Sequence, residues 1–250
     1  MSSCEQEAKR TKLNESPSSS QPTMSDALTF LSEICGNLKK IKRTGWVRQG
    51  VPLPESDSDH MHRCAMCAML VTTQKVDPRD DYSGENEKFH PDKIDGIKLL
   101  RMAVTHDLCE SLAGDITPFC AADAVASKHD KEKAAMEQIR KIVGDPLGVE
   151  LFNLWKEYEE LVTPEAIYCK DIDKFEMVMQ AYEYEKDHLK KKADSEREDK
   201  TVANEPMRTF FITTSGKMKS PLFKRLDKEL RTKRQAMLEE RGWDVTDQEQ

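Results

Sequence analysis

The chain has 250 residues, of which 37% are hydrophobic and 34% charged, so its length permits one large domain or two small ones with a buried core. A net charge of −7 argues against a general nucleic-acid-binding surface, but a phosphorylated small molecule fits if a metal supplies local positive charge. The N-terminus lacks the apolar run of a secretory signal, and no stretch approaches the roughly 18 apolar residues that span a bilayer. We therefore expect an intracellular, cytoplasmic protein that binds no membrane and no nucleic-acid polymer, and whose seven cysteines are mostly reduced.

Two capping motifs predict helices near the start of the chain. Residues 1–22 are rich in Ser, Glu and Lys, and we expect them to form a disordered tail. Thr23 and Asp26 have the spacing of a capping box, which predicts that a helix begins here. Ser56 and Asp59 repeat this spacing and predict a second helix that ends near position 73. The apolar stripe of the first helix comprises Leu28, Leu31, Ile34, Cys35, Leu38 and Ile41.

The middle of the chain predicts a long buried helix. Asp92 and Asp95 are suited to cap its N-terminus, and Gly114 and Pro118 are suited to end it. Between them, apolar residues recur at helical spacing and are expected to face the core. These residues are Ile94, Ile97, Leu100, Ala103 and Val104.

The second half of the chain adds further helices and ends in charged segments. Pro164 at a first helical position, followed by the acidic Glu165, predicts a long helix that ends near Glu185. The Thr-Phe-Phe-Ile-Thr run at 209–213 predicts a packed extended segment. About seven helices without alternating strands predict an all-α domain over 23–242. The other predicted segments are a helix over 128–143, a helix after Asp145-Pro146 with Leu151, Leu154, Trp155 and Tyr158 on its apolar face, a mobile charged segment over 186–206, a last helix over 220–241 and an acidic tail over 243–250.

Four polar side chains gather within the predicted central helix and its end. His106 and Glu110 share one helical face, and so do Asp107 and Glu110. A His beside an Asp is costly to bury without a partner, and a divalent cation would satisfy both. The alternatives are a hydrogen-bonded core pair for His106 and Asp107, and a plain turn residue for Asp115.

Three predicted helices each offer a candidate metal ligand. Two neutral imidazoles and two carboxylates suit a divalent ion such as Mn, Fe, Co, Zn or Mg. Periodicity alone does not bring the three helices to one point. The candidates are His60 in the second helix, His106 and Asp107 in the central helix, and Asp173 in the long later helix.

The blocks of sequence around these ligands are more specific than a bare His-Asp pair. In chain order they are Arg43-Thr-Gly-Trp46, Pro54-Glu-Ser-Asp-Ser-Asp-His60, Thr105-His-Asp-Leu-Cys-Glu-Ser-Leu-Ala-Gly-Asp-Ile-Thr-Pro118 and Asp173-Lys-Phe-Glu-Met177. Over roughly residues 24–190, the chain resembles the HD-domain metal-dependent phosphohydrolases, and within them the small eukaryotic proteins of the 5′-deoxynucleotidase type. The resemblance implies an HD-domain helical bundle around a metal site.

The resemblance also implies a set of metal ligands, namely His60, His106, Asp107 and Asp173. Asp171 is a second acid near the last of these positions. We prefer Asp173, because it fits the Asp-x-x-Glu-Met pattern of the family. The implied cofactor is a divalent cation such as Mn, Co or Mg.

Four further residues are candidates for catalysis or substrate binding, and the roles of the first two are implied by the resemblance. Glu110 and Asp115 are expected to act catalytically beside the metal, as ligands of a second metal or in handling the nucleophilic water. Arg43 is expected to grip the phosphate, and Trp46 to pack on the sugar or base. For these two residues, a solvated cation and a core aromatic are the alternatives.

The implied activity is metal-dependent removal of the 5′-phosphate from 2′-deoxyribonucleoside 5′-monophosphates, giving deoxynucleoside and phosphate. The resemblance also implies a homodimer. One alternative is another HD activity, such as a cyclic-nucleotide phosphodiesterase or a nucleoside triphosphohydrolase. The other is a nucleotide-binding protein without turnover. All four implied ligands are present, which argues against this last alternative.

Overall fold

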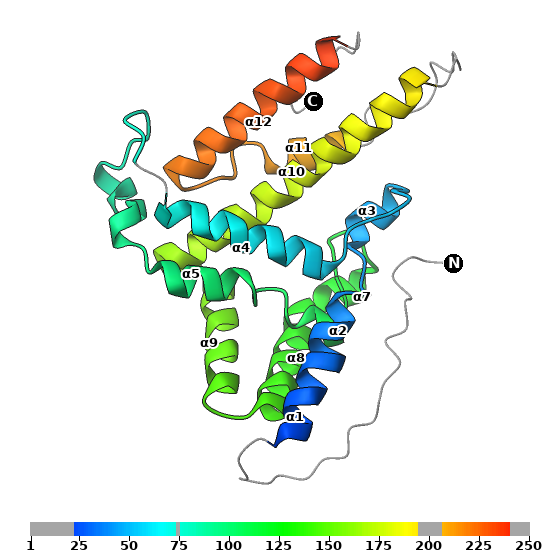
Figure 1. Ribbon diagram of the computed structural model, residues 1–250, viewed down its shortest axis with the longest axis vertical. Helices are drawn as coiled ribbons and strands as arrows, with labels where there is room; N and C mark the ends of the chain where they lie inside the picture. The colour runs from blue at the N-terminus through cyan, green and yellow to red at the C-terminus, as the bar shows by residue number, and fades with distance from the viewer. Residues whose placement is uncertain (1–22, 74–75, 195–206, 241–250) are drawn as a thin grey trace. The chain divides into compact units, whose positions relative to one another are not determined.

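The computed structural model of the protein describes residues 23–73, 76–194 and 207–240 (Figure 1). Within these ranges every regular element is a helix, which confirms the all-α fold class. Strand-like pairing there is limited to one antiparallel bridge between Lys42 and Ser56. No helix in the described part of the chain is long and apolar enough to cross a membrane.

Three predicted segments fall wholly or partly outside these ranges. The N-terminal tail over 1–22 and the acidic tail over 243–250 lie outside the described residues. Of the segment predicted to be mobile, residues 195–206 also lie outside. Residues 186–194 are described and continue the helix that begins at Pro164, which therefore extends beyond its predicted end near Glu185.

The chain divides into two compact units. The first comprises the described residues of Met1–His62 and Val104–Glu160, and the second those of Arg63–Ala103 and Leu161–Gln250. Helix α4 (Asp57–Thr73) begins in the first unit and continues into the second.

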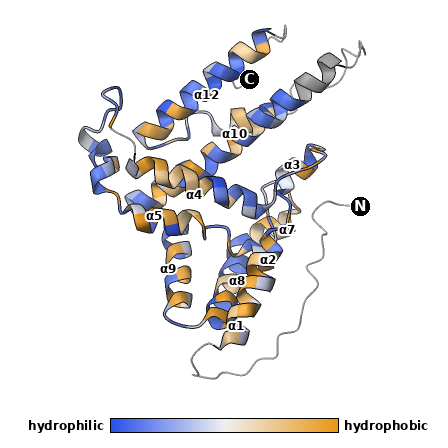
Figure 2. Cartoon of the chain, in the orientation of Figure 1, coloured by the Kyte–Doolittle hydropathy of each residue, from blue (hydrophilic) through white to orange (hydrophobic). Residues whose placement is uncertain are grey.

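The first unit buries an apolar core contributed by several short helices and by the paired helices α8 (Lys128–Val143) and α9 (Leu147–Glu160), which lie side by side (Figure 1). Both helices alternate polar and apolar residues along their length, as amphipathic helices do (Figure 2). The core includes Ile34, Leu38, Met61, Leu108, Cys109, Met136, Ile139, Leu151 and Trp155. The other elements of this unit are α1 (Met24–Thr29), η1 (Phe30–Ile34), α2 (Cys35–Leu38), α3 (Thr44–Arg48), α6 (Glu110–Ala113) and α7 (Ala122–Ala126).

Both predicted capping boxes are confirmed, but the apolar stripe of the first helix is confirmed only in part. Thr23 caps α1 with a reciprocal bond to Asp26. Leu28 and Leu31 are 67% and 60% exposed, whereas Ile34 is buried. The reason is the π-helical turn η1, because its wider turn shifts which face of the helix meets the core.

The second unit is organised on the long helix α10 (Pro164–Asp194), which packs with α5, α11 and α12 (Figure 1). Arg234 and Glu185 form a bidentate pair within this unit, with Nε–Oε2 and Nη2–Oε1 distances of 2.7 and 3.0 Å. Both side chains are 1% exposed. The elements of this unit are the remainder of α4, then η2 (Gly84–Phe89), η3 (Pro91–Lys93), α5 (Gly96–Ala103), α10, α11 (Arg208–Thr214) and α12 (Pro221–Glu240).

Two sequence predictions about these elements were wrong. The 209–213 run is helical, within α11, and its buried Phe211 packs under the Arg234 guanidinium, 4.0 Å from the ring centroid. The central helix is broken: α5 ends at Ala103, α6 begins at Glu110, and residues 104–109 form turns with i→i+3 hydrogen bonds. Tertiary packing overrides local propensity in both places.

Candidate metal and phosphate site

Asp107 lies at the centre of the candidate site in the first unit. Its Oδ2 accepts a hydrogen bond from Arg43 Nη1 at 3.0 Å. The same oxygen lies 3.4 Å from His106 Nε2 and 3.7 Å from His60 Nε2. The structure therefore brings together two predicted metal ligands and the predicted phosphate-binding residue around the third ligand.

Local structure explains how these groups converge. His60 lies in the first turn of α4, directly after the capping box of Ser56 and Asp59. His106 and Asp107 lie in the turns that interrupt the predicted central helix. Because the chain turns there, the two adjacent side chains are not held about 100° apart as in a regular helix.

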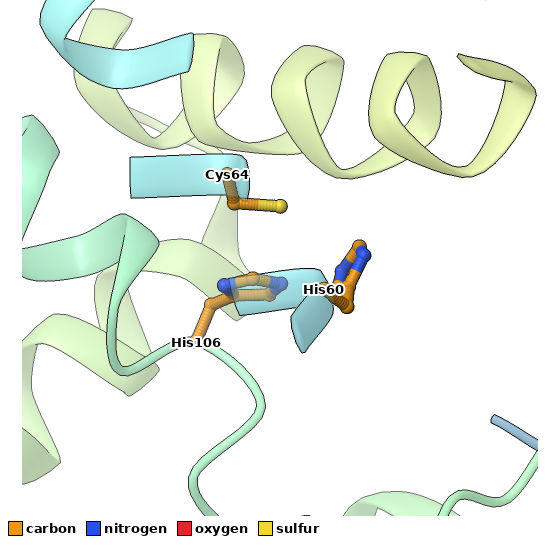
Figure 3. Close-up of side chains that lie close together, drawn as sticks. All are labelled: His60, Cys64 and His106. Atoms are coloured by element: carbon orange, nitrogen blue, oxygen red, sulfur yellow. The ribbon is translucent and has the colours of Figure 1, made fainter. Parts of the chain in front are cut away.

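The two imidazoles are fully enclosed. His60 is 0% exposed and His106 is 1% exposed, and their ring centroids lie 5.4 Å apart. Figure 3 shows both rings, with Cys64 one turn after His60 on α4. Tyr158 packs on His106 at 5.1 Å between ring centroids. Tyr158 thus packs on a predicted ligand, a contact that its place on an apolar helical face did not reveal.

The geometry and chemistry of this set fit a divalent cation. Two ligand atoms that each lie about 2.1 Å from one ion are about 3.0–3.4 Å apart at octahedral or tetrahedral angles. The 3.4 Å between His106 Nε2 and Asp107 Oδ2 falls in this range, and the 3.7 Å from His60 Nε2 is slightly longer. Imidazole nitrogen and carboxylate oxygen are ligands of Mn, Co, Zn and Mg sites.

Glu110, the first residue of α6, is a buried acid beside this set. It is 3% exposed, its Oε2 has no hydrogen-bond partner among the described residues, and that oxygen lies 3.8 Å from Arg43 Nη1. Burial raises the pKa of Glu110 well above its usual range, and the carboxylates of Asp107 and Asp115 raise it further. Glu110 is therefore suited to hold a proton that it can exchange.

Asp115 connects the end of this stretch to the residue after Arg43. Gly114 has a φ of +78°, a backbone conformation that favours glycine, and this turn brings Asp115 to α3. The Asp115 Oδ2 accepts the backbone N–H of Thr44 at 2.6 Å, and its carbonyl oxygen accepts the Thr44 hydroxyl at 2.8 Å. Asp115 is more than a turn residue, because it positions the backbone next to Arg43.

Arg43 and Trp46 have different surroundings. The Arg43 side chain is only 14% exposed, so it is not a solvated surface cation. Trp46 is 2% exposed and its Nε1–H donates to Glu55 Oε1 at 2.8 Å. The position of Trp46 favours the core interpretation that the sequence left open over a contact with sugar or base.

Asp173 and Asp171 both lie on α10, in the second unit. The Asp173 Oδ2 lies 3.1 Å from Lys170 Nζ. The Asp171 carboxylate accepts hydrogen bonds from the backbone N–H groups of Lys219 and Ser220 and from the Ser220 hydroxyl. Asp171 thus holds the start of α12, which supports the preference for Asp173 as the ligand.

One acid near the site was missed by the sequence analysis. Asp57 is 0% exposed, and neither carboxylate oxygen has a hydrogen-bond partner among the described residues. The capping box around it gave no signal that it is buried. A possible signal was its position, three residues before His60 in the same helix.

The fold and the site define the class of protein: the chain belongs to the HD domain family, which matches residues 35–210. HD domains are metal-dependent phosphohydrolase domains, and this confirms the predicted family and enzyme class. The chain is 43% identical over 213 residues to the 5′-deoxynucleotidase HDDC2 of Dictyostelium discoideum, covering 84% of this chain and 100% of the relative. It is 37% identical over 197 residues to the 5′-deoxynucleotidase HDDC2 of Xenopus laevis, covering 78% and 81%. A solved structure of a conserved hypothetical protein from Pyrococcus furiosus is similar with a TM-score of 0.57 and 26% identity, covering 84% of this chain and 99% of that one.

Proposed function

We propose that the protein hydrolyses 2′-deoxyribonucleoside 5′-monophosphates to deoxynucleoside and phosphate, using a divalent cation. The observation that carries the proposal is the convergence of His60, His106 and Arg43 on the Asp107 carboxylate. The proposal is also supported by two relatives, 43% and 37% identical to this chain, that are named 5′-deoxynucleotidases.

The cation ligands in this proposal are His60, His106, Asp107 and Asp173. The first three share the first unit, and Asp173 is assigned from the Asp-x-x-Glu-Met motif on α10. When bound, a divalent cation neutralises charge on the phosphate and lowers the pKa of water toward neutrality. Mn, Co and Mg are the ions we expect.

The chain's own residues then bind and orient the substrate and move a proton. Arg43 is suited to grip the phosphate, because its guanidinium already faces the buried carboxylates of Asp107 and Glu110. Glu110 has a raised pKa and takes up or delivers a proton as water attacks phosphorus. Asp115 is suited to act beside it and to hold Arg43 in place through Thr44.

Three finer features complete the proposal. The pocket at the sugar is expected to be too tight for a 2′-hydroxyl, which would select deoxy substrates. The protein is expected to act as a homodimer in the cytoplasm. Light scattering during size-exclusion chromatography tests the dimer: a mass near 57 kDa, twice the 28.6 kDa chain, is expected.

The decisive experiment is phosphate release from dAMP, dGMP, dCMP, TMP and dUMP compared with AMP. The protein is first stripped with chelator, and then Mn, Co, Mg, Zn or no metal is added. Metal-dependent release from the deoxy set, and not from AMP, is the expected result. Asp107→Ala should abolish both metal binding and release, and wild-type activity in this variant would refute the site.

If no phosphate is released, further substrates distinguish between the alternative functions. If folded, metal-loaded protein releases no phosphate from any monophosphate, the same samples are tested with a cyclic nucleotide and a nucleoside triphosphate. Turnover of either would replace the proposed reaction with another HD phosphohydrolase activity. No turnover with any substrate, together with retained nucleotide binding, would favour a non-catalytic binding protein.

A further inference from the structure

Asp57 is a buried acid that the roles assigned so far do not explain. It is the first residue of α4 and is 0% exposed. Neither of its carboxylate oxygens has a hydrogen-bond partner among the described residues. A carboxyl group that is buried without a hydrogen-bond partner is unfavourable even when it is protonated, and a bound cation would satisfy its oxygens.

The electrostatic surroundings of Asp57 are the residues of the candidate site. Burial raises the pKa of Asp57 to about 8. The Arg43 guanidinium opposes this shift, whereas the carboxylates of Asp115 and Asp107 add to it. Asp57 in turn raises the pKa of Glu110. The helix geometry agrees with this, because Asp57 and His60 are three residues apart in α4, neighbour each other on the helix surface and are both 0% exposed. Asp57 also belongs to the same first unit.

Four acids gather at the site, and Arg43 and Lys128 are protein cations that interact with them. Asp57, Asp107, Glu110 and Asp115 act on one another, and Arg43 is the guanidinium that lowers the pKa values of both Asp57 and Glu110. Glu110 resembles Asp57 in one respect: its Oε2 is also buried without a hydrogen-bond partner among the described residues. Carboxylate oxygens are the ligands that hard divalent cations prefer.

We propose that Asp57 is a further carboxylate ligand of the divalent-cation site, beyond the set that the sequence motifs identify. The proposal deepens the proposed function and rests on it. The competing explanation is structural: Asp57 would serve only as the charge partner of Arg43. In that case its removal would weaken the fold and leave cation binding intact.

The test compares Asp57→Asn with wild type by calorimetric titration of Mn²⁺ into chelator-stripped, full-length protein. Asn keeps the shape of the side chain and removes its charge. We expect the variant to bind Mn²⁺ at least tenfold more weakly or to lose one equivalent of the ion. Without metal and above pH 8, where the Asp57 carboxylate is charged, the melting temperature of the variant should equal or exceed that of wild type, since a buried charge is removed.

Two further variants make the test specific. Glu33→Gln removes one negative charge from an exposed residue of the same unit and should leave Mn²⁺ binding unchanged. Asp57→Ala should repeat the binding loss of Asp57→Asn, which would exclude an effect of the new amide. Wild-type Mn²⁺ affinity and stoichiometry in both Asp57 variants would overturn the proposal.

The stability measurement gives the second way to overturn it. A lower melting temperature of Asp57→Asn without metal, with unchanged Mn²⁺ binding, would establish the structural role instead. Failure of the proposed function looks different, because wild type itself would then bind no Mn²⁺ or release no phosphate. If wild type binds Mn²⁺ and hydrolyses dAMP while Asp57→Asn binds Mn²⁺ equally well, only the assignment of Asp57 fails.

Discussion

The Arg43 Nη1 donates a 3.0 Å hydrogen bond to the Asp107 Oδ2, so a guanidinium offsets the charge of the carboxylate on which both site imidazoles converge. The same nitrogen lies 3.8 Å from Glu110 Oε2. Arg43 lowers the electrostatic cost of packing acids together, and its second, proposed function is to bind the phosphate of the substrate.

Arg43→Ala should show both functions. In chelator-treated protein we expect a loss of about 1–3 kcal/mol in the free energy of unfolding, because the buried acids lose their charge-assisted partner. Saturating Mn²⁺ should recover most of this loss. Urea denaturation with and without metal measures the effect, and the KM for dAMP should rise in parallel. Lys141→Ala, an exposed cation of α8, is the control and should change neither quantity.

Glu110→Gln should separate turnover from folding. The substitution keeps the shape of a buried side chain and removes a group whose pKa burial raises. We expect a fall in kcat of about 100- to 10,000-fold, the usual contribution of a positioned acid or base. The circular dichroism spectrum should be unchanged. A kcat within threefold of wild type would remove Glu110 from the proton-transfer role.

The pH dependence of stability should reveal the buried acids. Burial raises the pKa of Asp57 to about 8 and that of Glu110 well above its usual range. The folded state then binds more protons than the unfolded state, so metal-free stability should increase as pH falls from 8 toward 5, the reverse of ordinary acid destabilisation. Urea midpoints in chelator at pH 8 and pH 6 measure this. The Asp57→Asn, Glu110→Gln double variant should have a smaller difference between the two midpoints, and an unchanged difference would contradict the prediction.

The sequence predicted most helices because their ends carry local chemistry. The capping boxes at Thr23 and Ser56 satisfy free backbone N–H groups by themselves, so they can be recognised without tertiary information. The same is true of Pro164 at the start of α10. By contrast, the broken central helix could not be predicted, because apolar periodicity continues through residues 104–109, where the packing of a polar site bends the chain.

The sequence predicted which residues form the candidate site, but it did not predict how they are arranged in space. His60, His106 and Asp107 were identified by motif, and their convergence required the turns that the sequence did not reveal. For other residues near the site, the sequence did not reveal whether the side chain is buried. Trp46 and Asp57 lie next to motif residues in the sequence, but only their exposed fractions distinguish a core position from an open one.

The buried ion pair in the second unit should be important for stability and dispensable for chemistry. Glu185→Ala removes the carboxylate that pairs with the Arg234 guanidinium at a position that is 1% exposed. We expect a loss of about 3–5 kcal/mol in the free energy of unfolding. Replacing both residues together, as Glu185→Leu with Arg234→Met, should cost less than Glu185→Ala alone. A larger cost for the double variant would show that the pair itself, and not the isolated charge, sets the stability.

Asp171 and Asp173 offer a matched pair of variants on one helix. Asp171→Ala removes the acceptor for Lys219 and Ser220 at the start of α12, so we expect it to lower the free energy of unfolding by about 1–3 kcal/mol. It should leave Mn²⁺ affinity close to wild type. Asp173→Ala should do the opposite, because Asp173 is the ligand implied by the Asp-x-x-Glu-Met motif and its pair with Lys170 is partly exposed. Calorimetric Mn²⁺ titration and urea denaturation of both variants decide the assignment: Mn²⁺ binding that survives Asp173→Ala and is lost in Asp171→Ala would exchange the two roles.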